Sequence, residues 1–147
     1  MAGAKQQELK TYRGNCHCGA FVFELDLPAE IKGAWECNCT LCSGKGYAWS
    51  FPIGESFNVV KGDENDLKVY TWNTGGVKHF FCSTCGTGLM ARDPSRPPGR
   101  QLVVNVRILP LFQMFKMRWM ITVVGSDTTN NCRFEPSRSQ STSRPSI

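Results

Sequence analysis

The sequence lacks the features that identify several large classes of protein. Its N-terminal stretch, MAGAKQQELKTYRG, has no apolar core of the kind that a signal peptide needs. Its most apolar segment, residues 108–124, contains Pro110, Lys116 and Arg118, whereas a membrane span needs about 20 apolar residues with few charges. We therefore expect a cytoplasmic protein in a reducing setting, with no membrane partner.

Strong charge of one sign is also missing. The formal net charge is only +5, and residues 126–147 carry three arginines against Asp127 and Glu135. Proteins that bind nucleic acids usually concentrate basic residues on one face or in one stretch. We therefore expect no nucleic-acid partner.

Several familiar catalytic patterns are absent as well. The chain has no Ser-His-Asp set, no pair of carboxylates at a recognisable spacing and no phosphate-binding loop. With 147 residues, of which 41% are hydrophobic and 20% charged, it has the size and composition of one soluble globular domain. The chemistry is therefore expected to come from the cysteines, in which the sequence is rich.

Seven of the eight cysteines fall into three tight clusters. These are a CxC pair, a CxCxxC triplet and a CxxC pair: Cys16 and Cys18; Cys37, Cys39 and Cys42; Cys82 and Cys85. In a reducing compartment, cysteines at such spacings are more often metal ligands than disulfides. Cys132 stands alone near the C-terminus, and we expect it to be an exposed thiol without a metal.

The number of clustered thiols predicts two different zinc sites. Two closed tetrahedral sites would need eight ligands, and only seven clustered thiols exist. The two outer pairs together supply four ligands for a closed, structural site, which leaves the triplet with three ligands and an open position. An open site can bind the sulfur of a small thiol, which zinc keeps ionised and ready to add to a carbonyl. Alternatively Cys132, His17 or His79 completes a second structural site.

Alternation of apolar and polar residues predicts an all-β fold of antiparallel strands, stapled by zinc. The expected strands are residues 21–27, 47–51, 57–60, 67–72, 77–81 and 101–106. Gly14 and Gly19 are expected to bracket a turn that holds Cys16 and Cys18, because glycine allows the backbone to wrap around a metal. Residues 1–11 are expected to be a mobile lead-in.

Two other interpretations are disfavoured. The CxxC pair could be a thioredoxin-like redox centre, but a redox pair usually opens a helix. Here the segment GTG that begins at Gly86 follows, and it shows no helical pattern. His79 lies in an aromatic strand, where a structural histidine is expected rather than a catalytic one.

Three segments together resemble the glutathione-dependent formaldehyde-activating enzyme family, which also includes centromere protein V. They are GNCHCGA (residues 14–20), CNCTLC (residues 37–42) followed by Lys45 and Gly46, and FCSTCGT (residues 81–87). The order and spacing of all three segments match, over roughly residues 12–109.

The resemblance implies the zinc-stapled β-tent fold of that family. It also implies a structural zinc on four cysteines and a catalytic zinc on the triplet: Cys16, Cys18, Cys82 and Cys85; Cys37, Cys39 and Cys42. The implied activity is that of a carbon–sulfur lyase, which joins glutathione and formaldehyde to S-hydroxymethylglutathione or reverses that reaction. In the centromere protein V branch the same fold is a protein-binding module without catalysis, and this is the alternative function.

Four residues are candidates for contacts with glutathione. Because glutathione carries two carboxylates, Lys45 and Arg107 are candidate anchors, and Tyr47 and Trp49 are candidate pocket walls.

The expected organisation has three parts. Residues 12–109 form the zinc-binding domain, residues 110–124 are an apolar segment to which the sequence assigns no role, and residues 125–147 are a disordered tail. The apolar segment leaves room for self-association, so an oligomer is possible.

Overall fold

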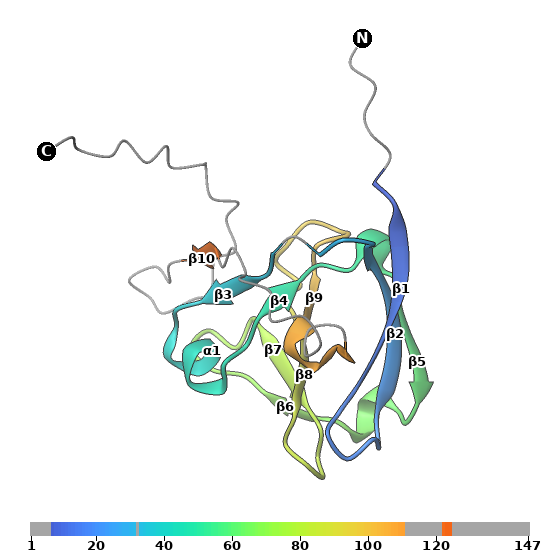
Figure 1. The fold of residues 1–147 in the computed structure, drawn as a ribbon. Helices are drawn as coiled ribbons and strands as arrows, with labels where there is room; N and C mark the ends of the chain where they lie inside the picture. The colour runs from blue at the N-terminus through green and yellow to red at the C-terminus, as the bar shows by residue number, and fades with distance from the viewer. Residues whose placement is uncertain (1–6, 32, 111–121, 125–147) are drawn as a thin grey trace, which may run out of the picture.

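A computed structural model describes residues 7–31, 33–110 and 122–124 of the chain, and their strands form two sheets (Figure 1). The smaller sheet has the order β1-β2-β5, and the larger has the order β10-β3-β4-β9-β8-β7-β6. The first three strands of the chain are divided between the sheets. Strands β1 (Leu9–Asn15) and β2 (Val22–Pro28) form a hairpin in the smaller sheet, and β3 (Trp35–Cys37) belongs to the larger sheet.

The remaining elements are short. The strands are β4 (Trp49–Ser50), β5 (Phe57–Lys61), β6 (Lys68–Tyr70), β7 (Lys78–Phe81), β8 (Gly88–Arg92), β9 (Leu102–Asn105) and β10 (Thr122–Val124). Within the described residues the α-helix is α1 (Thr40–Lys45), and the 3-10 helices are η1 (Ile53–Glu55), η2 (Glu64–Asp66) and η3 (Val106–Ile108). Every described strand pair is antiparallel except β10 with β3. The expected all-β class is therefore confirmed.

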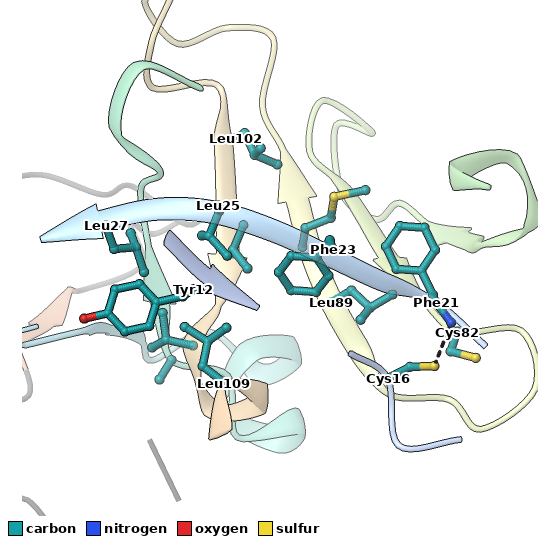
Figure 2. Packing of buried hydrophobic residues seen from close by; sticks show 14 of the residues in the cluster. Tyr12, Cys16, Phe21, Phe23, Leu25, Leu27, Cys82, Leu89, Leu102 and Leu109 are labelled. Carbon is teal, nitrogen blue, oxygen red and sulfur yellow. Dashed lines mark hydrogen bonds between the residues drawn. The ribbon is translucent and has the colours of Figure 1, made fainter. Parts of the chain in front are cut away.

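The main core lies between the two sheets (Figure 2). Strand β2 alternates as the sequence predicts, so that Phe23, Leu25 and Leu27 are buried while the residues between them are only half-buried. These side chains pack in one cluster with Leu89 of β8 and Leu102 of β9. Burial of large apolar side chains from both sheets is the main stabilising contribution that the fold itself provides.

Most strand predictions agree with the structure, and the differences have physical causes. The expected strands at residues 21–27, 47–51, 57–60, 67–72, 77–81 and 101–106 each contain or overlap an observed strand. The lead-in prediction is wrong from Leu9, where β1 begins; residues 1–6 lie outside the described part. Strand β1 buries only Tyr12 and Gly14, so its apolar periodicity is too weak to detect in the sequence.

Strand β10 brings a late segment of the chain to the edge of the larger sheet, beside β3. It pairs in parallel with β3, and Val124 lies opposite Cys37. The other predictions for this segment fall on residues 111–121, and those for the tail with Cys132 fall on residues 125–147; both ranges lie outside the described part. Among the described residues, no helix is long and apolar enough to cross a membrane.

Candidate metal centres and adjacent pocket

Two glycine-assisted turns bring the outer cysteine pairs together. In the first, Gly19 has a φ of 71°, and its N–H donates to the carbonyl of Cys16. In the second, Gly86 has a φ of 74°, and its N–H donates to the carbonyl of Cys82 at 2.9 Å. A positive φ at these positions strongly favours glycine, so each turn is specified locally.

The four sulfurs of this cluster fit a tetrahedral zinc ion. The cluster consists of Cys16, Cys18, Cys82 and Cys85, and its sulfurs all lie within 4.8 Å of one another. The Sγ atoms of Cys16 and Cys18 are 3.5 Å apart, and those of Cys18 and Cys82 are 3.7 Å apart. Tetrahedral zinc with Zn–S bonds of about 2.3 Å places its sulfurs about 3.8 Å apart. We call this group the four-cysteine cluster.

The thiols of the four-cysteine cluster influence one another's ionisation. Although desolvation opposes ionisation of Cys85, hydrogen bonds from Thr87 and Cys18 lower the pKa of its thiol to about 5. The backbone of Ala20 favours ionisation of Cys18, yet its hydrogen bonds with Cys16 and Cys82 contribute to raising the pKa of Cys18 to about 11. Opposite pKa shifts within one cluster show that the thiols oppose one another's ionisation, an effect that a bound cation would relieve.

The triplet is assembled by a strand end and the first turn of α1. Cys37 ends β3, Cys39 is the N-cap of α1, and Cys42 lies inside the helix. The Sγ of Cys39 accepts a hydrogen bond from the backbone N–H of Cys42 at 3.4 Å. Gly46, with a φ of 63°, ends the helix in the left-handed conformation that favours glycine.

The sulfurs of the triplet are close enough to share one ion. Those of Cys37, Cys39 and Cys42 lie within 4.8 Å of one another, and all three residues are buried. Among the described residues, no fourth His, Cys, Asp or Glu joins this group, and neither His17 nor His79 is part of it. Soft thiolates are ligands that zinc prefers, so both cysteine groups could hold that metal.

A pocket of about 190 Å³ lies beside α1. Two of its lining residues come from α1, one follows the C-cap residue Gly46, and three come from β6 and β7: Leu41, Lys45, Tyr47, Tyr70, His79 and Phe81. Antiparallel pairing places Tyr70 of β6 opposite His79 of β7. Leu41 and Tyr47 also pack in the core cluster that contains the triplet. The pocket is therefore adjacent to the triplet.

Two titratable rings in this pocket are neutral at pH 7. Burial outweighs the opposing charge of Cys37 and, with a smaller contribution from the positive charge of Lys45, lowers the pKa of His79 to about 4. Burial and the negative charge of Cys42 raise the pKa of Tyr47 to about 12. The two rings are stacked, with centroids 6.1 Å apart and planes inclined by 11°. The Nδ1 atom of His79 is buried and has no hydrogen-bond partner within the described part of the chain.

Besides Tyr47, which lines the pocket, the other predicted substrate contacts occupy different environments. Lys45 lines the pocket, with its Nζ 5.1 Å from the ring centroid of Phe81. Trp49 is fully buried beneath Tyr47, with ring centroids 4.5 Å apart, and it does not line the pocket. Arg107 forms an ion pair with Glu36, which precedes Cys37 on β3, and it does not line the pocket either.

Comparison with known proteins identifies the family. Residues 11–119 match the family described as glutathione-dependent formaldehyde-activating enzyme. The chain belongs to this family. The match to this family covers all three cysteine clusters and the pocket residues, and it extends past residue 109.

A solved structure supports the same assignment. The crystal structure of a Rhodobacter sphaeroides protein shares 31% sequence identity with the chain and superposes with a TM-score of 0.59. The match covers 74% of this chain and 99% of the Rhodobacter chain. The family suggests glutathione-dependent activation of formaldehyde, with glutathione and formaldehyde as substrates.

The sequence did not predict part of the pocket. Leu41 and Phe81 lie inside the family segments, so their proximity to the cysteines was visible, but their place in the pocket was not. Tyr70 carries no sequence signal, because only the pairing of β6 with β7 brings it beside His79. His79, which was expected to be structural, is buried and also lines the pocket.

Proposed function

We propose that the chain is a zinc-dependent carbon–sulfur lyase that acts on glutathione–aldehyde adducts, with residues 12–109 as its catalytic domain. The observation that carries the proposal is the triplet, in which three buried sulfurs converge and no fourth His, Cys, Asp or Glu of the described residues joins them. A pocket beside the same helix supports it, because a substrate can reach the vicinity of the triplet.

The two cysteine groups have different roles in this proposal. The four-cysteine cluster joins the turn after β1 to the turn after β7, so it holds the two sheets together. A zinc ion on Cys37, Cys39 and Cys42 supplies a positive charge that keeps a thiol sulfur ionised at neutral pH. The triplet itself fixes where that sulfur lies, beside the pocket.

The reaction needs one bond to form and one proton to move. The glutathione thiol gives up its proton, and its sulfur forms a C–S bond with the aldehyde carbon. The π electrons of the carbonyl move to oxygen, and that oxygen takes up a proton from solvent; breakdown of the adduct is the reverse. Tyr47 keeps its proton, so its hydroxyl is available to donate to the carbonyl oxygen. Lys45 is the candidate partner for a glutathione carboxylate.

The test must measure acceleration, because glutathione and formaldehyde combine readily without help. Exchange between free glutathione and S-hydroxymethylglutathione is measured at equilibrium by NMR exchange spectroscopy, with and without the zinc-loaded protein. We expect faster exchange with the wild-type protein and none of that increase with Cys42→Ser. Equal acceleration by the two proteins would overturn the role of the triplet.

Removal of the metal gives an independent test and separates the lyase from a protein-binding module. A lyase should hold two zinc ions per chain, one of which a mild chelator removes first and glutathione protects. A single zinc ion, or two that resist the chelator equally, would favour the module.

A further inference from the structure

We propose that the pocket beside the triplet binds the apolar substituent of an aldehyde, so that the preferred substrates are glutathione adducts of apolar aldehydes larger than formaldehyde. The inference rests on the proposed lyase function and specifies its substrate class. It is carried by the lining of the pocket, its size and its position relative to the triplet.

The lining is mostly apolar and aromatic. Leu41, Tyr47, Tyr70 and Phe81 line the pocket together with the neutral ring of His79. Lys45 is the charged side chain among the lining residues, and its ammonium group lies over the ring of Phe81. Pockets of this kind bind apolar groups through burial of surface, and the few polar atoms fix orientation.

The peptide part of glutathione does not fit this lining. Glutathione carries two carboxylates and an ammonium group, and a charge that is buried without a partner costs several kcal/mol. Among the described residues that line it, the pocket offers one cation, Lys45, and no acidic side chain. Lys45 can pair with one carboxylate at the edge, while the other charged groups of glutathione remain outside.

Formaldehyde is too small to fill the space. One water molecule occupies about 30 Å³ in the liquid, and formaldehyde has only two heavy atoms. A pocket of about 190 Å³ therefore has room for several carbon atoms beyond the carbonyl. With formaldehyde alone, Leu41, Tyr70 and Phe81 would have no substituent to contact.

The position of the pocket relates it to the reacting sulfur. Leu41 precedes Cys42 on α1 and packs against the core cluster that contains the triplet. Another lining residue, Tyr70, lies on the edge strand β6 and is 49% exposed, so the pocket opens to solvent there. An adduct with its sulfur at the triplet can thus extend a substituent along Leu41 toward Tyr70.

A series of aldehydes tests the inference. Exchange of the glutathione adducts of formaldehyde, propanal, butanal and benzaldehyde is measured by NMR, and each rate with protein is divided by the rate without it. Each buried CH₂ contributes up to about a fourfold gain, so butanal should be accelerated about tenfold or more above formaldehyde. Acceleration of formaldehyde with no gain for the larger aldehydes overturns the substrate class and leaves the lyase function intact. No acceleration of any adduct overturns the lyase function itself.

A pair of neighbouring variants locates the effect. Val69 and Tyr70 are adjacent on β6 and similarly exposed, at 48% and 49%, but only Tyr70 lines the pocket. Tyr70→Ala should lower the ratio of butanal to formaldehyde acceleration by about fivefold, because part of the wall is lost. Val69→Ala should leave the ratio unchanged. A similar loss in both variants, or in neither, would overturn the assignment of this pocket.

Discussion

The backbone N–H of Cys42 donates a hydrogen bond to the Sγ of Cys39 at 3.4 Å, so α1 begins on a sulfur that also belongs to the triplet. The N-cap position is usually held by Ser, Thr, Asp or Asn. The helix has only six residues and includes Gly44, so its intrinsic propensity is weak. The helix and the candidate metal site therefore depend on the same atom.

The dual role of Cys39 can be separated by two substitutions. Cys39→Ser replaces the sulfur by an oxygen that still caps the helix, whereas Cys39→Ala removes the cap. Both variants should lose the zinc of the triplet and keep that of the four-cysteine cluster. In urea unfolding, Cys39→Ala should be less stable than Cys39→Ser by about 1 kcal/mol. Equal stability would show that the side chain at this position does not support the helix.

The two cysteine groups should respond differently to loss of one thiol. A structural zinc site contributes roughly 10 kcal/mol or more, which is comparable to the whole stability of a domain. Cys82→Ala should therefore leave the protein largely unfolded by circular dichroism. Cys42→Ala should remain folded with one zinc ion per chain by elemental analysis, and it should lose adduct exchange. A folded Cys82→Ala protein would contradict the structural role of the four-cysteine cluster.

The fold could be predicted from the sequence where one face of a strand is buried. Strand β2 alternates clearly, and its prediction is confirmed. Strand β8 begins at Gly88, and its Leu89, Met90 and Ala91 are all buried, so alternation could not reveal it. The helix α1 was missed because a sulfur cap and the spacing of the cysteines, rather than apolar periodicity, define it.

The candidate site could be predicted only in part for a related reason. Cysteine spacing is local, so the three clusters of thiols are visible in the sequence, and the structure brings the sulfurs of each group within 4.8 Å of one another. The pocket is not local, because strand pairing joins Tyr70 and His79 to the neighbourhood of α1. The predicted contact Arg107 forms an ion pair with Glu36 instead of lining this pocket. Its role toward glutathione remains a prediction.

The close approach of Gly88 to Tyr47 should make this glycine sensitive to substitution. A Cβ at position 88 would lie 2.2 Å from the Tyr47 ring and 2.4 Å from its hydroxyl. Because Tyr47 is buried, Gly88→Ala should cost about 1–3 kcal/mol of unfolding free energy and shift the pocket wall. The matched control is Gly44→Ala, where a Cβ would meet nothing within 4 Å. In urea unfolding, Gly44→Ala should raise the free energy of unfolding by up to about 1 kcal/mol, because alanine is favoured over glycine inside a helix.

Burial of neutral His79 should make the stability of the protein depend on pH. Its pKa falls from 6.5 to about 4 on folding, so the unfolded chain binds a proton in this window that the folded chain does not bind. The contribution of His79 to the unfolding free energy is therefore fully present above pH 6.5 and is lost as the pH falls through about 4. Its size is about 3 kcal/mol.

Acid also releases zinc, and this loss affects every form of the protein. A variant at position 79 separates the contribution of His79 from that effect. The charged or titratable groups that act on His79 are Cys37, Lys45 and the neighbouring ring of Tyr47. His79→Gln keeps all three groups and removes only the titrating ring. Between pH 7 and pH 4, the unfolding free energy of the wild-type protein should fall by about 3 kcal/mol more than that of the variant. Parallel pH profiles for the two proteins would mean that His79 is protonated in the fold as readily as in the unfolded chain.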